Sequence, residues 1–298
     1  MEAHSHPRPL IARGRTVLAD YIQMTKPKVQ SLLLFTTVTT MYVAGRPSLG
    51  LVALTCLGGA LSAGGAGAIN HALDRDLDAM MKRTANRPVP SGRVSPKAAI
   101  VYGVLLGCAS FALLALTVNA LAAVLAMSGL LGYVLVYTLW LKRSTPQNIV
   151  IGGAAGAMPV LIGWAAVTRT VGAPAWVMFM IIFLWTPPHF WALAMRYRDD
   201  YAAAGVPMMP VVRTESETTQ QILLYAIVLV FVTLILSPVG GLGALYAVSA
   251  AALGVGFIYR AAQLRLRPDP QTAFGLFKYS VTYLGLLFAA IAVDRLFW

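Results

Sequence analysis

Charged residues are scarce in this chain of 298 residues, and acidic residues are the scarcest of them. Lys, Arg, Asp and Glu together make up 11% of the residues, whereas 58% are hydrophobic. The mean hydropathy is +0.71. Because a soluble domain carries roughly 25% charged residues, this composition excludes a soluble globular protein. It predicts an all-α, polytopic membrane protein.

Cysteine is nearly absent as well. The two cysteines, Cys56 and Cys108, both lie inside apolar runs, which excludes a disulfide framework and a paired-cysteine metal or redox site. Residues 1–24 lack an apolar core of their own, so they are not a cleavable secretory signal. We expect residues 1–24 to form a loose cytoplasmic tail and residues 25–298 to form a single intramembrane domain.

Long apolar runs are what the chain has instead, and about nine of them are long enough, or nearly so, to cross a membrane. They are residues 29–44, 49–73, 98–116, 120–139, 148–167, 176–195, 220–237, 242–262 and 274–297. If the N-terminus lies inside, every basic residue except Arg46, Arg169 and Arg295 falls on the inner side. The positive-inside rule therefore predicts a cytoplasmic (inner) membrane protein with the N-terminus in the cytoplasm and the C-terminus outside. The net charge of +12 is then explained by the membrane topology, and we expect no nucleic-acid partner.

One polar stretch follows the uncharged run from Leu49 to Ile69. On a continuous helix, Asn70, Asp74 and Asp78 would form a stripe at i, i+4 and i+8, whereas Asp76 would lie about 200° away from Asp74. An amide and two carboxylates on one face suit Mg²⁺, which is commonly held by one or two carboxylates plus substrate phosphates. The alternative is a solvated helix end stabilised by neighbouring charges.

Basic residues follow at the same predicted membrane face. Arg83 and Arg87 lie in the next loop, and Lys142 and Arg143 end the fourth apolar run. They are candidates to bind phosphate oxygens, and the alternative for the loop arginines is contact with lipid headgroups. A second, weaker acidic site is Asp199 with Asp200, because adjacent residues on a helix face different directions.

The sixth apolar run contains Pro187, Pro188 and then His189. Two prolines break the hydrogen bonding of a membrane helix, and broken membrane helices commonly line a cavity. This pattern favours a substrate-facing His189, although a histidine bonded across helices for packing is the alternative.

Together these features predict an enzyme. Mg²⁺ and Lys or Arg side chains stabilise the charge that develops on a departing diphosphate, and aromatic side chains stabilise a carbocation. The nearby aromatic residues are Tyr133, Tyr137, Trp185, Phe190 and Trp191. A cavity open to lipid would accept an isoprenoid tail, so we interpret the chain as an intramembrane prenyltransferase. An ion-coupled transporter is less favoured, since its polar groups would lie near the bilayer midplane.

Several motifs support a named resemblance. They are Asn70-x-x-x-Asp74-x-x-x-Asp78, Arg83-Thr84-x-x-Arg87-Pro88, Trp140-Leu-Lys142-Arg143, Trp185-x-Pro187-Pro188-His189-Phe190-Trp191 and Asp200-Tyr201. In order and spacing they resemble the UbiA-type prenyltransferases, and within them the branch that farnesylates protohaem IX (the haem O synthases). The resemblance covers about residues 21–298.

The resemblance implies a nine-helix bundle with a polar cavity that faces the cytoplasm, and farnesyl transfer from farnesyl diphosphate to a vinyl group of haem B, giving haem O. It implies Mg²⁺ as cofactor, held by Asn70, Asp74 and Asp78. It implies a diphosphate site made of Asn70, Arg83, Arg87, Lys142, Arg143, Asp199 and Asp200. The catalytic candidates are Asp74, Asp78, Lys142 and His189, and the candidates for haem contact are His189, Trp191 and Arg196.

One departure leaves alternatives open. The wider family has a second DxxxD motif, which this chain lacks around Asp199 and Asp200. His189 would then serve haem as an iron ligand or a proton-transfer group. The main alternative function is prenylation of a quinone or phenolic ring. A haem-modifying enzyme or oxidase assembly factors are expected as downstream partners.

Overall fold

The computed structural model describes residues 10–297, and in this part of the chain all regular secondary structure is helical, without a strand. The long helices are α1 (Leu10–Met24), α2 (Pro27–Ala44), α3 (Leu49–Leu73), α5 (Pro96–Thr117), α6 (Ala120–Leu131), α8 (Asn148–Thr168), α9 (Ala173–Arg196), α12 (Glu215–Gly240), α13 (Ala244–Leu266) and α14 (Pro270–Phe297). The short ones are α4 (Arg75–Met80), α7 (Lys142–Ser144), α10 (Arg198–Ala203) and α11 (Met209–Val212). A π-helical segment, η1 (Gly132–Leu141), joins α6 to α7.

Eight helices within the described residues are long and apolar enough to cross a membrane, and α6, η1 and α7 together count as one of them. The ninth predicted span is α2, an 18-residue helix that packs against α3, α8 and α14. Its threonines lower its hydropathy, yet Thr36, Thr37 and Thr40 are buried and donate to carbonyls of their own helix. The all-α membrane bundle predicted from the sequence is confirmed.

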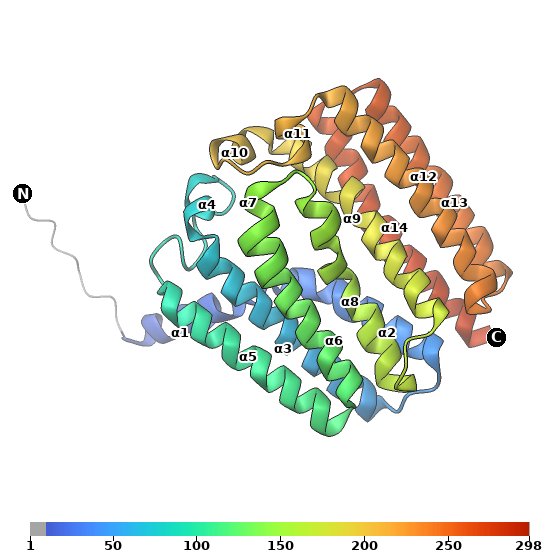
Figure 1. Ribbon diagram of the computed structural model, residues 1–298, viewed down its shortest axis with the longest axis horizontal. Coiled ribbons are helices and arrows are strands. Elements are labelled where there is room, and N and C mark those ends of the chain that lie inside the picture. The colour runs from blue at the N-terminus through green and yellow to red at the C-terminus, as the bar shows by residue number, and fades with distance from the viewer. Residues whose placement is uncertain (1–9, 298) are drawn as a thin grey trace, which may run out of the picture.

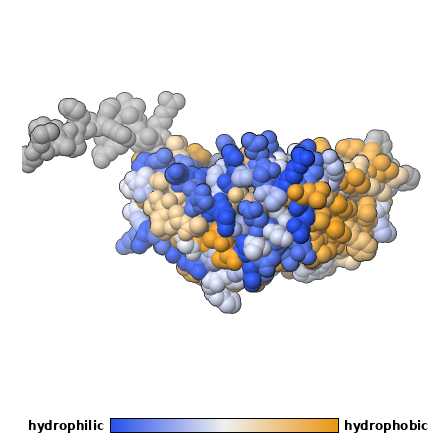
Figure 2. Space-filling view, turned by 90° about the horizontal axis from the view of Figure 1, so that it is seen from above, coloured by the Kyte–Doolittle hydropathy of each residue, from blue (hydrophilic) through white to orange (hydrophobic). Residues whose placement is uncertain are grey.

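The four short helices gather at one end of the bundle (Figure 1). Seen from that end, hydrophilic residues cover the middle and much of the left side, and the right flank is hydrophobic (Figure 2). Beneath these helices lies a buried apolar cluster that joins α4 to α9, α10 and the segment before α11. It comprises Leu77, Met81, Ile149, Ala194, Tyr201, Ala204, Val206 and Met208. This cluster fixes the polar loops, because α4 and α10 each bury an apolar residue in it, Leu77 and Tyr201.

Helices α3 and α5 approach each other closely through glycine. A Cβ atom built on Gly65 would lie 2.6 Å from the carbonyl oxygen of Gly103, and one built on Gly103 would lie 2.7 Å from that of Gly65. Small residues permit such backbone contact between membrane helices. The contact brings the end of α3, where the acidic stretch begins, into the bundle.

The N-terminal tail differs from the loose segment expected. Residues 1–9 lie outside the described range, but Leu10–Met24 form α1. Near the end of α1, Asp20 accepts two hydrogen bonds from Nε of Arg93, both at 3.0 Å, and the ring of Tyr21 packs edge-on against Tyr102. The helix is held because its last turns have both an ion-pair partner and an aromatic partner.

Candidate active site

The acidic stretch lies at a helix junction, and this is a correction to the continuous helix predicted. Helix α3 ends at Leu73, Asp74 is its C-cap with φ −92° and ψ 8°, and α4 begins at Arg75. The backbone N–H of Asp74 still donates to Asn70, and that of Asp78 still donates to Asp74. The stripe therefore survives the break. Asn70, Asp74 and Asp78 are at most 2% exposed, as buried metal or phosphate ligands would be.

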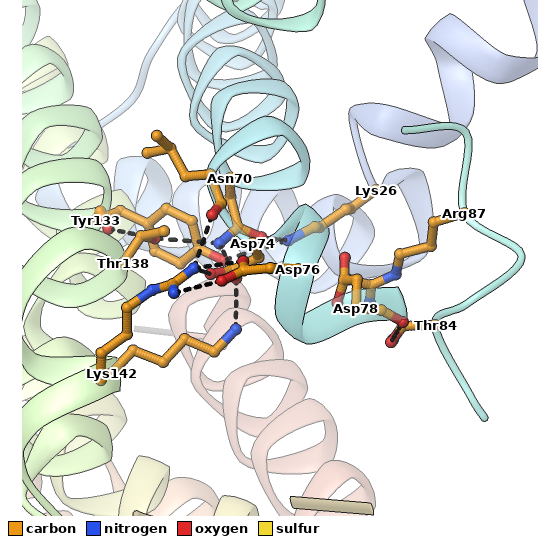
Figure 3. A network of polar contacts seen from close by, with 12 residues as sticks. Lys26, Asn70, Asp74, Asp76, Asp78, Thr84, Arg87, Tyr133, Thr138 and Lys142 are labelled. Atoms are coloured by element: carbon orange, nitrogen blue, oxygen red, sulfur yellow. Dashed lines mark hydrogen bonds and ion pairs between the residues drawn. The ribbon is translucent and has the colours of Figure 1, made fainter. Parts of the chain in front are cut away.

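Asp74 is the centre of a polar network (Figure 3). Its Oδ2 accepts from Nδ2 of Asn70 at 2.7 Å and forms an ion pair with Nζ of Lys142. The same amide nitrogen of Asn70 donates to the hydroxyl of Thr138 at 3.1 Å. Helices α3 and α7, far apart in sequence, thus meet at one carboxylate. Thr138 was not singled out from the sequence, because a threonine within an apolar run carries no signal of its own.

Asp78 forms its ion pair with a different cation, Arg87. Nη1 of Arg87 donates to both of its carboxylate oxygens, at 2.8 and 3.0 Å, and Thr84 Oγ1 donates to its backbone carbonyl at 2.9 Å. These three residues come from α4 and the following loop, so the loop folds back onto the helix that precedes it. An arginine and a carboxylate so placed form a strong charge-assisted pair.

Asp76 lies off the stripe and on the surface, with its side chain 55% exposed. Two nitrogens of Arg143 donate to its two carboxylate oxygens, both at 2.7 Å. The guanidinium of Arg143 holds the pKa of Asp76 down at about 2. Arg143 also donates to the carbonyl of Leu73 at 2.8 Å, so it fastens the junction between α3 and α4.

Lys26 is the principal residue that the sequence analysis missed. Its Nζ donates to Oδ1 of Asn70 at 2.8 Å and to the hydroxyl of Tyr133 at 3.3 Å. Its pKa is lowered to about 8, mainly by burial and next by the nearby charge of Arg87, while Asp74 opposes the shift. Lys26 therefore keeps most of its charge at neutral pH.

The chain reaches this position by a strained turn next to a glycine. Lys26 has φ +55° and ψ +56°, a left-handed conformation that costs a non-glycine residue about 1–2 kcal/mol. A Cβ on Gly67 of α3 would lie 2.8 Å from the carbonyl oxygen of Met24. Gly67 thus makes room for the turn, and Asn70 lies one helical turn further along. A lysine before a proline at a membrane boundary is ordinarily an interface anchor, which is why the sequence pattern did not reveal this contact.

The remaining acidic candidates lie across the polar end. Asp199 is exposed and Asp200 is partly buried, both in the first turn of α10. Arg83 faces the same segment, since its guanidinium lies 5.6 Å from the ring centre of Tyr197. The structure does not pair either aspartate with a cation within the described residues.

His189 is buried inside the bundle, on the part of α9 that contains the two prolines. Its Nδ1 lies 2.7 Å from Oγ of Ser280 on α14. Its ring stacks on Trp185, with centroids 4.1 Å apart, and also contacts Phe190 and Phe277. The histidine is therefore hydrogen-bonded across helices, and both the packing and the substrate-facing interpretations remain predictions.

Trp191 and Arg196 are not brought together with the imidazole. Trp191 lies two residues beyond His189, about 200° round the helix, and is 1% exposed with its ring against Tyr225. Arg196 ends α9, with its guanidinium 5.7 Å from the ring centre of Phe274. Trp191 thus packs against α12, whereas Arg196 stays on the polar end of the bundle.

The acidic stretch fits a hard divalent cation in charge and in donor type. Oδ1 of Asp74 is buried and has no hydrogen-bond partner among the described residues, so one carboxylate oxygen is free for a ligand. No group of three or more His, Cys, Asp or Glu side chains in residues 10–297 forms a metal cluster. A set of two carboxylates and one amide matches Mg²⁺, which takes the rest of its ligands from water and phosphate.

A membrane bundle with this acidic junction at one end has the fold of the intramembrane prenyltransferases. A digeranylgeranylglyceryl phosphate synthase structure aligns with a TM-score of 0.79 and 18% identity, over 94% of this chain and 99% of that one. A UbiA homologue from Archaeoglobus fulgidus, bound to GPP and Mg²⁺, aligns with a TM-score of 0.66 and 16% identity, over 91% and 99%. At such identities the likeness shows the fold alone.

The family follows from sequence comparison. The model of the UbiA prenyltransferase family matches residues 32–289, and the chain belongs to this family. A protein of Gloeobacter violaceus named protoheme IX farnesyltransferase is 52% identical over 96% of this chain and 95% of its own length. One of the same name from Chloroflexus aurantiacus is 53% identical over 95% of this chain, which spans 48% of that longer protein. The family predicted from the motifs, and the prediction of an enzyme, are confirmed.

Proposed function

We propose that this chain transfers a farnesyl group from farnesyl diphosphate to a vinyl group of haem B. The observation that carries the proposal is the convergence of two buried carboxylates, Asp74 and Asp78, with the cations Lys142, Arg87 and Lys26. Such a set binds an anion that arrives with its own metal. The relatives named protoheme IX farnesyltransferase support haem as the acceptor.

The reaction breaks the bond between C1 of the farnesyl group and its diphosphate oxygen, and the electron pair leaves with the diphosphate. The vinyl π electrons form the new carbon–carbon bond. Water then adds to the cation that remains on the second vinyl carbon and loses its proton to solvent, which leaves a hydroxyl. Atoms balance with water as the co-reactant.

The residues of this chain act on the diphosphate end. In the structure Lys142 and Arg87 neutralise Asp74 and Asp78, and we propose that both cations exchange a carboxylate for a phosphate oxygen when the diphosphate binds. Charge placed in advance around a departing anion stabilises the transition state more than the bound substrate. Arg83 and Arg143, with Asp199 and Asp200, complete the proposed rim of the site.

Mg²⁺ is proposed as the cofactor. Asp74, through its unpartnered Oδ1, and Asp78 with Asn70 would hold it. When bound, the ion supplies positive charge that stabilises the leaving diphosphate. Asn70 meanwhile orients Asp74 through the hydrogen bond from its amide, and Lys26 fixes that amide through its oxygen.

The allylic end faces aromatic side chains. Tyr133 and Tyr137 lie next to the acidic stretch, with ring centroids 5.3 Å apart, and Tyr133 also contacts Lys26. Ring faces attract a carbocation and do not trap it as a nucleophile would. His189, one helix away, is proposed to face the haem, and Arg196 is proposed to approach it from the polar end.

The protein is multi-pass, and we propose that its polar end lies in the cytoplasm of a cell whose inner membrane contains it. Residues 25–298 act as a single domain in this proposal, with the N-terminus inside and the C-terminus outside. The basic loops around Arg83, Lys142 and Arg196 would then meet diphosphate supplied from the cytoplasm. A haem-modifying enzyme or an oxidase assembly factor is the proposed recipient of the product.

The test is a product mass. Membranes containing the protein are incubated with haem B, farnesyl diphosphate and Mg²⁺, and the porphyrins are extracted and analysed by mass spectrometry. We expect a product heavier than haem B by one farnesyl group and one hydroxyl. Chelation by EDTA should stop the reaction and added Mg²⁺ should restore it. Modification of an added quinone or phenol, with haem B unchanged, would overturn the assignment of the acceptor.

A further inference from the structure

One residue of α14 binds two rings on α9, and neither contact was expected from the sequence. The backbone carbonyl of Ser280 accepts from Nε1 of Trp185 at 2.8 Å, and its hydroxyl lies 2.7 Å from Nδ1 of His189. Trp185 and His189 are one helical turn apart, and their rings stack at 21°. Ser280 itself is fully buried. These two hydrogen bonds of Ser280 are separate from the polar network around Asp74.

The proton positions follow from a third contact. Oγ of Ser280 lies 2.6 Å from the carbonyl oxygen of Phe277. Because a carbonyl oxygen only accepts, the single hydroxyl proton must lie on that bond. The hydroxyl oxygen is then an acceptor toward His189, and Nδ1 of the imidazole must carry its proton. In a neutral imidazole the proton on Nδ1 leaves Nε2 with a free lone pair.

The other ring nitrogen of His189, Nε2, has no hydrogen-bond partner in the part of the chain that the structure describes. Nor is it one of the fully buried atoms without a partner, as Nδ1 of His71 is. It therefore keeps some accessible surface. The stacked Trp185 and the tilted Phe277 limit the rotation of the ring, so that the lone pair has a fixed direction.

From this geometry we infer that Ser280 is a positioning residue for haem, which holds His189 in the tautomer that presents its Nε2 lone pair to the haem iron. The inference rests on the proposed function, since haem is the substrate there. Ligating histidines ordinarily donate their other ring N–H to an acceptor, which fixes the tautomer and raises the basicity of the ligating nitrogen. Ser280 is such an acceptor, already in place and itself held by Phe277.

The chain offers a matched control on the same helix. Tyr283, three residues after Ser280, is also fully buried, and its hydroxyl bonds to Oγ1 of Thr233 on α12 at 2.8 Å. Tyr283→Phe therefore removes one buried interhelical hydrogen bond, as Ser280→Ala does, without touching His189. Ser280→Thr keeps the hydroxyl. The carbonyl that binds Trp185 is backbone and survives all of these substitutions.

The experiment titrates the purified full chain and these variants, with His189→Ala, against haem B. Absorbance gives the affinity, and resonance Raman of the ferrous complex gives the iron–histidine stretching band. We expect Ser280→Ala to weaken haem binding about 10- to 100-fold, the usual effect of removing such a partner, and to lower the frequency of the band. Ser280→Thr and Tyr283→Phe should keep both near the parent values.

The outcomes separate this inference from the proposed function. Equal losses in Ser280→Ala and Tyr283→Phe would make Ser280 a packing residue and overturn the inference. The inference would also be overturned if Ser280→Ala kept the parental haem affinity and an unshifted iron–histidine band while His189→Ala lost haem binding. A parent protein that binds no haem, or whose haem binding is unaffected by His189→Ala, would instead refute the haem assignment made under the proposed function, and the inference with it.

Discussion

Lys142 and Asp74 are 68 positions apart in the chain, yet their side chains form a direct ion pair in which the carboxylate of Asp74 is buried. Lys142 lies in the last turn of the span Ala120–Ser144, and Asp74 caps α3. The same carboxylate oxygen also accepts from Asn70. The other, Oδ1, has no hydrogen-bond partner among the described residues and lies 3.9 Å from Nη2 of Arg143. The pair therefore joins two helix ends at the point where a phosphate and its metal are proposed to bind.

Removing charge from the stripe should abolish turnover while the protein still folds and inserts. In Asp74→Asn or Asp78→Asn we expect the rate to fall by about 100-fold or more, as when one charge-stabilising group is lost from an active site. The matched control is Asp76→Asn, since Asp76 is exposed and bound only to Arg143 among the described residues. It should be much milder. Equal losses from all three substitutions would show that position on the stripe does not matter.

Substitutions of the adjacent basic residues Lys142 and Arg143 should also differ in their effect on activity. Lys142→Met should reduce kcat/KM for farnesyl diphosphate by about 100-fold, because Lys142 lies at the buried carboxylate. Arg143→Met should cost far less, because Arg143 makes its close carboxylate contacts with exposed Asp76, at 2.7 Å, and lies 3.9 Å from Asp74. Steady-state kinetics on purified protein give both values. The double variant Lys142→Met with Asp74→Asn controls for the buried charge left unpaired, since it should recover stability without recovering activity.

Gly103, in the contact between α3 and α5, and Gly156, in an open position on α8, should respond in opposite ways to substitution by alanine. Gly103→Ala would place a Cβ 2.5 Å from Cγ1 of Ile69 and 2.7 Å from the carbonyl of Gly65, so we expect destabilisation of about 1–3 kcal/mol from overpacking. Gly156→Ala meets nothing within 4 Å and should be neutral or stabilising by up to about 1 kcal/mol. Thermal unfolding in detergent measures both. Similar unfolding temperatures for the two variants would contradict the close backbone approach.

The orientation of the bundle is testable by labelling. Ser91 and Val118 lie at the two ends of α5 (Pro96–Thr117), and Ser91 is on the end with the short helices. In a background that lacks Cys56 and Cys108, a membrane-impermeant maleimide added to intact cells should label a cysteine at Val118 and not one at Ser91. The reverse pattern would place the candidate site outside the cell.

The class of fold and the family could be predicted from the sequence alone. Hydropathy and the basic loops were enough to predict a helical membrane bundle, because only helices and closed β-barrels can span a bilayer. The spacing of Asn70, Asp74 and Asp78 was enough to place them on one face, since hydrogen bonding between residues four apart continues through the junction. The motifs were enough for the family.

The pairing of the charged side chains could not be predicted from the sequence. Asp74 forms an ion pair with Lys142, Asp78 with Arg87 and Asp76 with Arg143. A rule based on charge alone would have allowed any of these cations to pair with any of these carboxylates. The turn at Lys26 depends on a close approach to Gly67, and Ser280 reaches His189 from the last helix. Such contacts depend on how helices distant in sequence pack together, and a local pattern contains no information about that packing.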